Sequence, residues 1–323
     1  MRDSTYTFFD LMDGKVDSLP VDQVFQIHIP KAGGTSVTAL FQRNDYQPLI
    51  FDMVQETFFH TISRENWEYA KSNLRPRKRA LHLMAGHYRL DNPLLKTSHP
   101  HAIVTLLRDP IERALSHFNF TAAVEGNPWH TEVLNGTMSF IDYVSWLVAP
   151  NSVGPQYSFF DDTGNGSFAY TGTASAKTCF SNLSSKVGVF GLTEFFDEFA
   201  VTAGLLLGLN DLLALSLRNE TLAFTKSVHP SVKRNLSDDE RSHVENLLGD
   251  DIWFYSEARK LYEYRRAHPK ISSVLDEALP ILKRANADLK ALHAITDPDD
   301  PQRFAFAGTT RLRRKLDPKQ GAY

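Results

Sequence analysis

A glycine-rich stretch directly after a short apolar run holds the residue types best suited to chemistry in this sequence. Residues 28–36 read HIPKAGGTS and follow the run VFQI at 24–27. Glycines let the chain turn tightly enough for its N–H groups to point inward, and a helix that begins there adds N–H groups and the positive end of its dipole. Such a turn binds phosphate, although it would also serve as a plain connection between a strand and a helix. The predicted phosphate contacts are Lys31, Ala32, Gly33, Gly34, Thr35 and Ser36.

An arginine and a serine follow a second apolar run, at residues 102–107. Arg108 ends the run, and Ser116 lies eight residues later. Between them, the letters DPIE at 109–112 place Asp, Pro and Glu where an N-cap, a first helical position and a capping box prefer them, so a helix is predicted to begin there. Ser116 then lies two turns on, where its hydroxyl and the Arg108 guanidinium can hold one anion. A surface ion pair beside a helix cap is the alternative for the same residues.

A histidine follows a third apolar run, at residues 80–85. His87 comes directly after Gly86, and a histidine with its ordinary pKa near 6.5 can act as a general base. A structural role is the alternative, and nearby histidines compete for the catalytic one. Those competitors are His28, His60, His82, His99, His101 and His117. Basic residues around this region would attract an anionic acceptor or form a solvated loop, namely Arg75, Arg77, Lys78, Arg79 and Arg89.

Short apolar strands that alternate with helices predict an α/β fold, with a central parallel sheet and helices on both faces. In such sheets, ligands bind beyond the carboxyl ends of the strands, so the three stretches are expected to meet at one edge. The predicted strands are 24–29, 80–85, 102–107 and 187–191. The predicted helices are 35–43, 61–74, one from 110, 137–148, one from 193 to about 207, 237–266 and one from about 271.

The chain divides by composition into three parts. Residues 1–22 are predicted to be a polar lead-in, residues 23–268 an α/β domain with a phosphate-binding strand, loop and helix, and residues 269–323 a C-terminal helix and basic tail. Residues 150–182 are rich in Gly, Ser, Thr and Asn, and we expect a long loop there that contacts substrate.

Composition excludes several classes of protein. The 323 residues carry a formal net charge of −3, so no overall basic field favours nucleic acid or an anionic membrane. A single cysteine, Cys179, excludes an intrachain disulfide. No membrane span or signal peptide is predicted, which indicates a cytoplasmic protein. Six N-x-S/T triplets point to the alternative, a Golgi lumen location with a membrane anchor outside this sequence.

Three motifs together resemble the sulfotransferases that use 3′-phosphoadenosine-5′-phosphosulfate (PAPS), particularly the carbohydrate branch that includes the heparan sulfate and uronyl 2-O-sulfotransferases. HIPKAGGTS at 28–36 is similar to the family's 5′-phosphosulfate loop, TLLRDPIERALSHF at 105–118 to its 3′-phosphate motif, and AGHYRL at 85–90 to the segment with its catalytic base. Weaker matches at 187–199 and 250–264 extend the resemblance over about residues 23–265.

This resemblance implies roles for individual residues. Lys31 would stabilise the leaving group, 3′-phosphoadenosine-5′-phosphate (PAP), and His87 would deprotonate an acceptor hydroxyl, expected on a glycan. Arg108 and Ser116 would hold the 3′-phosphate, and no metal is required. Apart from the resemblance, we expect the segment 223–235 to close over the nucleotide, with Lys226, Lys233 or Arg234 near the 3′-phosphate. Golgi members of the family carry a membrane anchor and usually disulfides. This sequence shows neither feature, which favours a soluble bacterial-type member. Ala85 stands where some 2-O enzymes have a second histidine.

Two other functions remain open from the sequence. One is a P-loop kinase or NTPase, with residues 103–109 as a Walker B strand that ends in Asp109. Against it, Lys31 precedes the glycines, whereas the Walker A motif places its lysine after them. The other is a non-catalytic module that binds nucleotide or glycan.

Overall fold

The computed structural model describes residues 5–16, 19–50, 81–92, 95–149, 152–163, 174–213 and 236–295. The helix predicted at 61–74, the proposed lysines Lys226 and Lys233, and the basic tail lie outside the described residues.

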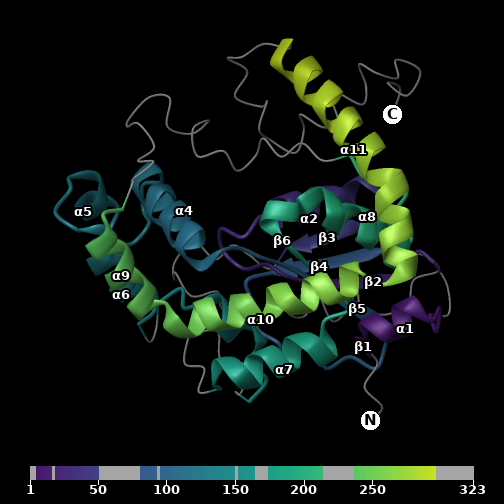
Figure 1. Cartoon of the computed structure of the whole chain (residues 1–323), viewed down its shortest axis with the longest axis horizontal. Helices are drawn as coiled ribbons and strands as arrows, with labels where there is room; N and C mark the ends of the chain where they lie inside the picture. The colour runs from purple at the N-terminus through teal and green to yellow at the C-terminus, as the bar shows by residue number, and fades with distance from the viewer. Residues whose placement is uncertain are drawn as a thin grey trace.

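The described strands form one parallel sheet at the centre of the molecule (Figure 1). Its path is β1-β5-β2-β4-β3, and β6 also pairs with β5. β1 pairs with residues 101–102 of β5. β6 pairs with residues 104–107 of the same strand, so β1 and β6 share one edge of β5. The strands are β1 (Thr5–Tyr6), β2 (Gln23–Ile27), β3 (Gln47–Ile50), β4 (His82–Gly86), β5 (His101–Leu107) and β6 (Val189–Leu192).

Helices cover both faces of this sheet, as predicted (Figure 1). One face packs against α1 (Phe8–Met12), α2 (Gly34–Arg43), α8 (Phe196–Leu207) and α11 (Pro269–Ile295). The other packs against the 3₁₀ helix η2 (Gln156–Phe160), α7 (Ala176–Lys186) and α10 (Gly249–Arg266). Because side chains alternate along a strand, Val24 joins the first core and Phe25 the second, and both β2 and β5 are buried throughout.

A third, smaller group of helices lies beside the sheet, at the left of Figure 1. Its buried residues include Ala114, Phe140 and Val244. The helices are α4 (Pro110–Ala123), α6 (Phe140–Leu147) and α9 (Asp238–Leu247), with α5 (His130–Leu134) next to α4. A further 3₁₀ turn, η3 (Thr193–Phe195), joins β6 to α8.

The N-terminal residues differ from the expected polar lead-in. Residues 5–12 supply an edge strand and α1, whose Phe8, Leu11 and Met12 are buried in the core. A capping box formed by Thr7 and Asp10 starts this helix, and that T-x-x-D spacing was a signal available in the sequence.

The segment 150–182 is not one long loop, because it contains η2 and the start of α7. Ser175 caps α7, and only one side of that helix, with Cys179 and Leu183, is buried. The polar remainder of the helix faces outward, and its composition resembles that of a loop. Residues 237–266 likewise form two helices, α9 and α10, rather than one. Ser237 and Glu240 form the expected capping box at the start of α9.

No helix within the described ranges is both long enough and apolar enough to cross a membrane.

Candidate active site

The three stretches that contain Lys31, His87 and Arg108 lie at the carboxyl ends of three neighbouring strands, as the sequence predicted. β2 is the middle strand of the three, and its last residue, Ile27, pairs with Gly86 of β4 and with Thr105 of β5. The loop after β2, His87 after β4 and Arg108 after β5 therefore leave the sheet at the same edge.

The loop after β2 turns sharply into α2 through two left-handed residues. Lys31 has φ 64° and Gly33 has φ 85°. A side chain at Gly33 would combine that backbone conformation with a Cβ 3.2 Å from Leu106 Cδ1, so glycine is required there. Ser36 N–H donates to Gly33 O at 3.0 Å, which closes the first turn of α2. The first helical N–H groups, at Gly34 and Thr35, lie at the open end of that turn, and N–H groups at a helix N-terminus are suited to an anion.

Buried polar side chains fix this loop from beneath. Gln26, in the middle of β2, donates through Nε2 to Gly34 O at 2.6 Å and accepts from Thr38 Oγ1 at 2.8 Å. Thr193 Oγ1 lies 2.8 Å from Ala32 O and 3.0 Å from Leu107 O, so it ties the loop to the end of β5. Sequence reasoning missed both Gln26 and Thr193. A polar residue inside an otherwise apolar strand was the only signal for Gln26.

The side chain of Lys31 lies over an aromatic ring of α4. Its Nζ is 4.2 Å from the centre of the Phe120 ring, a cation–π contact. Burial, and secondarily the charge of Arg108, lower the pKa of Lys31 to about 8. The ammonium therefore remains mainly charged at neutral pH, and its hydration is already reduced. A phosphate or sulfate oxygen placed beside it would interact strongly with it.

Arg108 joins the second phosphate motif to the first. Its Nη1 donates to Lys31 O at 3.2 Å, and its Nη2 lies 3.9 Å from Glu112 Oε2. The Gln156 side chain fixes its main chain, accepting from Arg108 N at 3.2 Å and donating to Arg108 O at 2.8 Å. Asp251 in turn accepts the Gln156 N–H at 3.1 Å. Sequence spacing gave no sign of Gln156, which lies 48 residues beyond Arg108.

The helix after Arg108 begins as predicted. Asp109 Oδ1 accepts N–H bonds from Ile111 and Glu112, both at 3.0 Å, and Pro110 is the first helical residue. Ser116 lies buried on this helix, α4. The described contacts of the Arg108 guanidinium are those to Lys31 and Glu112, so a shared anion between Arg108 and Ser116 remains a prediction.

His87 contacts the first motif through His28. Its Nδ1 is hydrogen-bonded to His28 O, and the two imidazole rings lie 4.5 Å apart between centres. Because the carbonyl oxygen only accepts, His87 Nδ1 carries the proton, and in the neutral ring the lone pair is then on Nε2. That atom is the one with the character of a base.

His117, one of the competing histidines, belongs to a buried network on α4. Its Nδ1 is 2.5 Å from Tyr143 OH, which is 2.6 Å from Thr121 Oγ1. Burial, followed by the charges of Arg113, Lys31 and His87, lowers the pKa of His117 to about 3. The influence of both Lys31 and His87 on this one ring is a sign that the two candidate catalytic residues lie in the same region. His117 itself stays neutral at physiological pH.

Other competing histidines have structural surroundings. His101 is buried, with Nε2 3.1 Å from Thr5 Oγ1 and Nδ1 2.9 Å from His99 O. His82 is buried within β4, and His60 lies outside the described residues.

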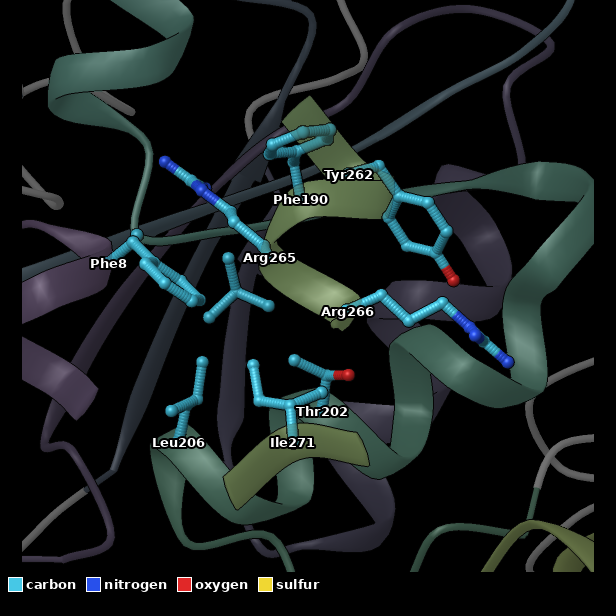
Figure 2. Close-up of a pocket in the computed structure, with 10 residues that line it drawn as sticks. Phe8, Phe190, Thr202, Leu206, Tyr262, Arg265, Arg266 and Ile271 are labelled. Atoms are coloured by element: carbon cyan, nitrogen blue, oxygen red, sulfur yellow. The ribbon is translucent and has the colours of Figure 1, made fainter. Parts of the chain in front are cut away.

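A small apolar cavity lies away from these strand ends (Figure 2). It measures about 20 Å³ and lies near the start of β6. Arg265 and Arg266 project from it in different directions (Figure 2). The Arg265 guanidinium lies over the rings of Phe8 and Phe190 and donates to Val187 O at 3.3 Å. Arg266 instead donates to Glu198 at 2.7 Å. Both guanidinium groups thus have partners within the protein, and the cavity has room for little more than one water molecule.

Among the described residues, no cluster of three or more His, Cys, Asp or Glu side chains could hold a metal ion. The carboxyl ends of the strands bring together the turn that begins α2, the side chains of Lys31 and Arg108, and the imidazole of His87.

Comparison with known proteins finds similarity among solved structures. The chain matches no protein-family model and no curated protein. Among solved structures it is similar to the crystal structure of mouse sulfotransferase SULT7A1 complexed with PAP, at 15% sequence identity and a TM-score of 0.41. The match covers 80% of this chain and 94% of that chain.

Proposed function

We propose that this protein is a PAPS-dependent sulfotransferase, which moves a sulfuryl group to an acceptor hydroxyl. The observation that carries the proposal is the contact between its two phosphate motifs. Arg108 Nη1 donates to the main-chain oxygen of Lys31, so a guanidinium and an ammonium lie beside one anion-binding turn. A nucleotide with phosphates at both its 5′ and 3′ positions fits that pair of cations.

The turn at residues 33–36 would hold the 5′-phosphate through its N–H groups and hydroxyls. This phosphate is not transferred, because the bond that breaks joins its bridging oxygen to sulfur. Negative charge grows on that oxygen as the bond breaks, and Lys31 would stabilise it. The order of the motif, lysine before glycines, suits a residue that contacts the leaving group from the strand side of the loop.

Arg108 and Ser116 would hold the 3′-phosphate. This phosphate distinguishes PAPS from ATP, and a guanidinium binds it through two parallel N–H donors. The two hydrogen bonds from the Gln156 side chain to the Arg108 main chain support this role, because they limit where the guanidinium can reach. Lys226 and Lys233 remain additional candidates for the same phosphate.

His87 would act as the general base. Its Nε2 would take the proton of the acceptor hydroxyl as that oxygen attacks sulfur in line with the leaving oxygen. The new bond joins the acceptor oxygen to sulfur, the sulfur–oxygen bond to the 5′-phosphate breaks, and PAP leaves. We place a carbohydrate hydroxyl in the acceptor position, because the three motifs resemble the carbohydrate branch.

Transfer of radiolabelled sulfate from PAPS to a panel of glycans, lipid-linked sugars and small alcohols tests this function. We expect transfer by the wild-type protein, and its loss in Lys31→Ala and His87→Ala. Undiminished transfer by Lys31→Ala would refute the mechanism. Undiminished transfer by His87→Ala would refute only the assignment of the base. PAP binding with no transfer to any acceptor would favour the non-catalytic module.

A kinase or NTPase is less compatible with the site. The Asp109 carboxylate, which a Walker B reading requires for magnesium, accepts two helix N–H groups as an N-cap. Competition binding separates the two functions. We expect PAP to displace a fluorescent nucleotide and ATP with Mg²⁺ to compete poorly; the reverse order would favour the kinase.

A further inference from the structure

We propose that His28, the first residue of the phosphate-loop motif, positions the imidazole of His87 and connects it to the donor loop. The inference rests on the proposed function, which names His87 as the base. It assigns His28 no contact with the reacting atoms, only an effect that acts through His87.

The main chain at His28 extends the pairing of β2 with β4 beyond the ends of the strands. His28 N donates to Gly86 O at 2.9 Å, which fixes the His28 carbonyl relative to the residue just before His87. That carbonyl then accepts from His87 Nδ1. The imidazole thus occupies the place of the next N–H group in the ladder, and its tautomer is set by the same backbone that begins the phosphate loop.

The ring of His28 is close both to His87 and to the first helical residue of α2, Gly34. It contacts the His87 ring at 4.5 Å between centres, with the planes tilted by 45°. It also fills the space that a side chain at Gly34 would need. A Cβ built there would lie 1.9 Å from His28 Cδ2 and 2.4 Å from its Nε2. Gly34 is held in turn through its carbonyl by Gln26.

This arrangement makes donor binding and base orientation interdependent. A movement of the loop around a phosphate moves Gly34, and the packed rings of His28 and His87 must follow, because protein interiors leave no gap to absorb it. An acceptor hydroxyl would then meet a base whose orientation is set by the loop that holds the donor. A protein that lacked this link could hold the donor and still present a misaligned imidazole.

The test compares His28→Ala, which removes the ring, with His28→Phe, which keeps an aromatic ring of similar size. His243→Ala, at an exposed histidine of α9, is the matched control. Histidine ¹⁵N spectra of the ligand-free protein report the tautomer of His87, whose signal is identified by its loss in His87→Gln. Steady-state transfer and PAP binding are measured on the same variants.

We expect one His87 tautomer, protonated at Nδ1, in the wild type, in His28→Phe and in the control. His28→Ala keeps the carbonyl that accepts from His87 Nδ1 but removes the ring packed against the imidazole, so the imidazole should leave that carbonyl part of the time. This variant should therefore show a mixture of tautomers and lose about tenfold to a hundredfold in kcat, with a smaller change in the Kd of PAP. A single Nδ1-protonated tautomer and unchanged kcat in His28→Ala would overturn the proposal, as would failure of His28→Phe to restore both. If the wild type transfers no sulfate, the proposed function fails, while the spectra still decide whether His28 orients His87.

Discussion

The lowered pKa of Lys31 predicts that affinity for PAP falls steeply above neutral pH. Burial, and then the Arg108 charge, bring that pKa to about 8, so raising the pH from 7 to 9 removes most of the ammonium. The phosphates of PAP are largely in their doubly charged form throughout this range, since their second ionisation lies near pH 6. If only the charged form of Lys31 binds well, the apparent Kd rises about tenfold between pH 7 and pH 9.

Two variants isolate the contribution of this lysine. Lys31→Arg keeps a cation whose pKa lies far above the range, so its Kd should stay nearly flat from pH 7 to pH 9. Lys31→Ala should bind PAP weakly at every pH and be equally flat. Isothermal titration calorimetry at several pH values, at constant ionic strength, measures all three proteins. A wild-type Kd that does not change between pH 7 and pH 9, or a tenfold rise retained by Lys31→Arg, would refute this account of the site.

Three further predictions follow from neighbouring contacts. Phe120→Leu removes the cation–π contact that favours the Lys31 ammonium, so the midpoint of the PAP binding profile should move about half a unit to one unit lower in pH; an unmoved midpoint contradicts the contact. The pKa of His117 is lowered to about 3 in the folded protein. Between pH 3 and pH 6.5 the unfolded chain therefore binds more protons at this residue than the folded protein does, and the free energy of unfolding decreases as the pH falls. In urea unfolding, the free energy of unfolding should decrease between pH 7 and pH 5 by about 2 kcal/mol more in the wild type than in His117→Asn. Equal decreases in the two proteins would exclude the effect. Gly34→Ala must displace the His28 ring and should destabilise the protein by about 1–3 kcal/mol, whereas Gly249→Ala, with open space around its Cβ, should change stability little; equal effects would contradict the packing.

Local sequence signals located most of the elements that carry the site. Apolar runs predicted β2, β4 and β5, and the sequence DPIE predicted the start of α4, because burial on both sheet faces and helix capping depend on residues close together in the chain. The same local signals did not locate two helices whose polar residues are typical of loops. The polar outer face of α7 resembled a loop, and the short capped helix α1 was overlooked within an apparently polar terminus.

The sequence by itself determined which residues have the chemistry: a lysine and two glycines after one strand, an arginine after a second, and a histidine after a third. It also determined that they meet at one edge, because parallel strands end on the same side. Only the tertiary structure decided how these residues are held. Gln156 reaches Arg108 across 48 positions, His28 packs against both His87 and Gly34, and the ring of Phe120 lies under the Lys31 ammonium. Such contacts join segments that are distant in the chain, and burial within them changes the pKa of Lys31 and of His117. No local pattern of residue types specifies either the contacts or the pKa values, since both arise from the packing of the whole domain.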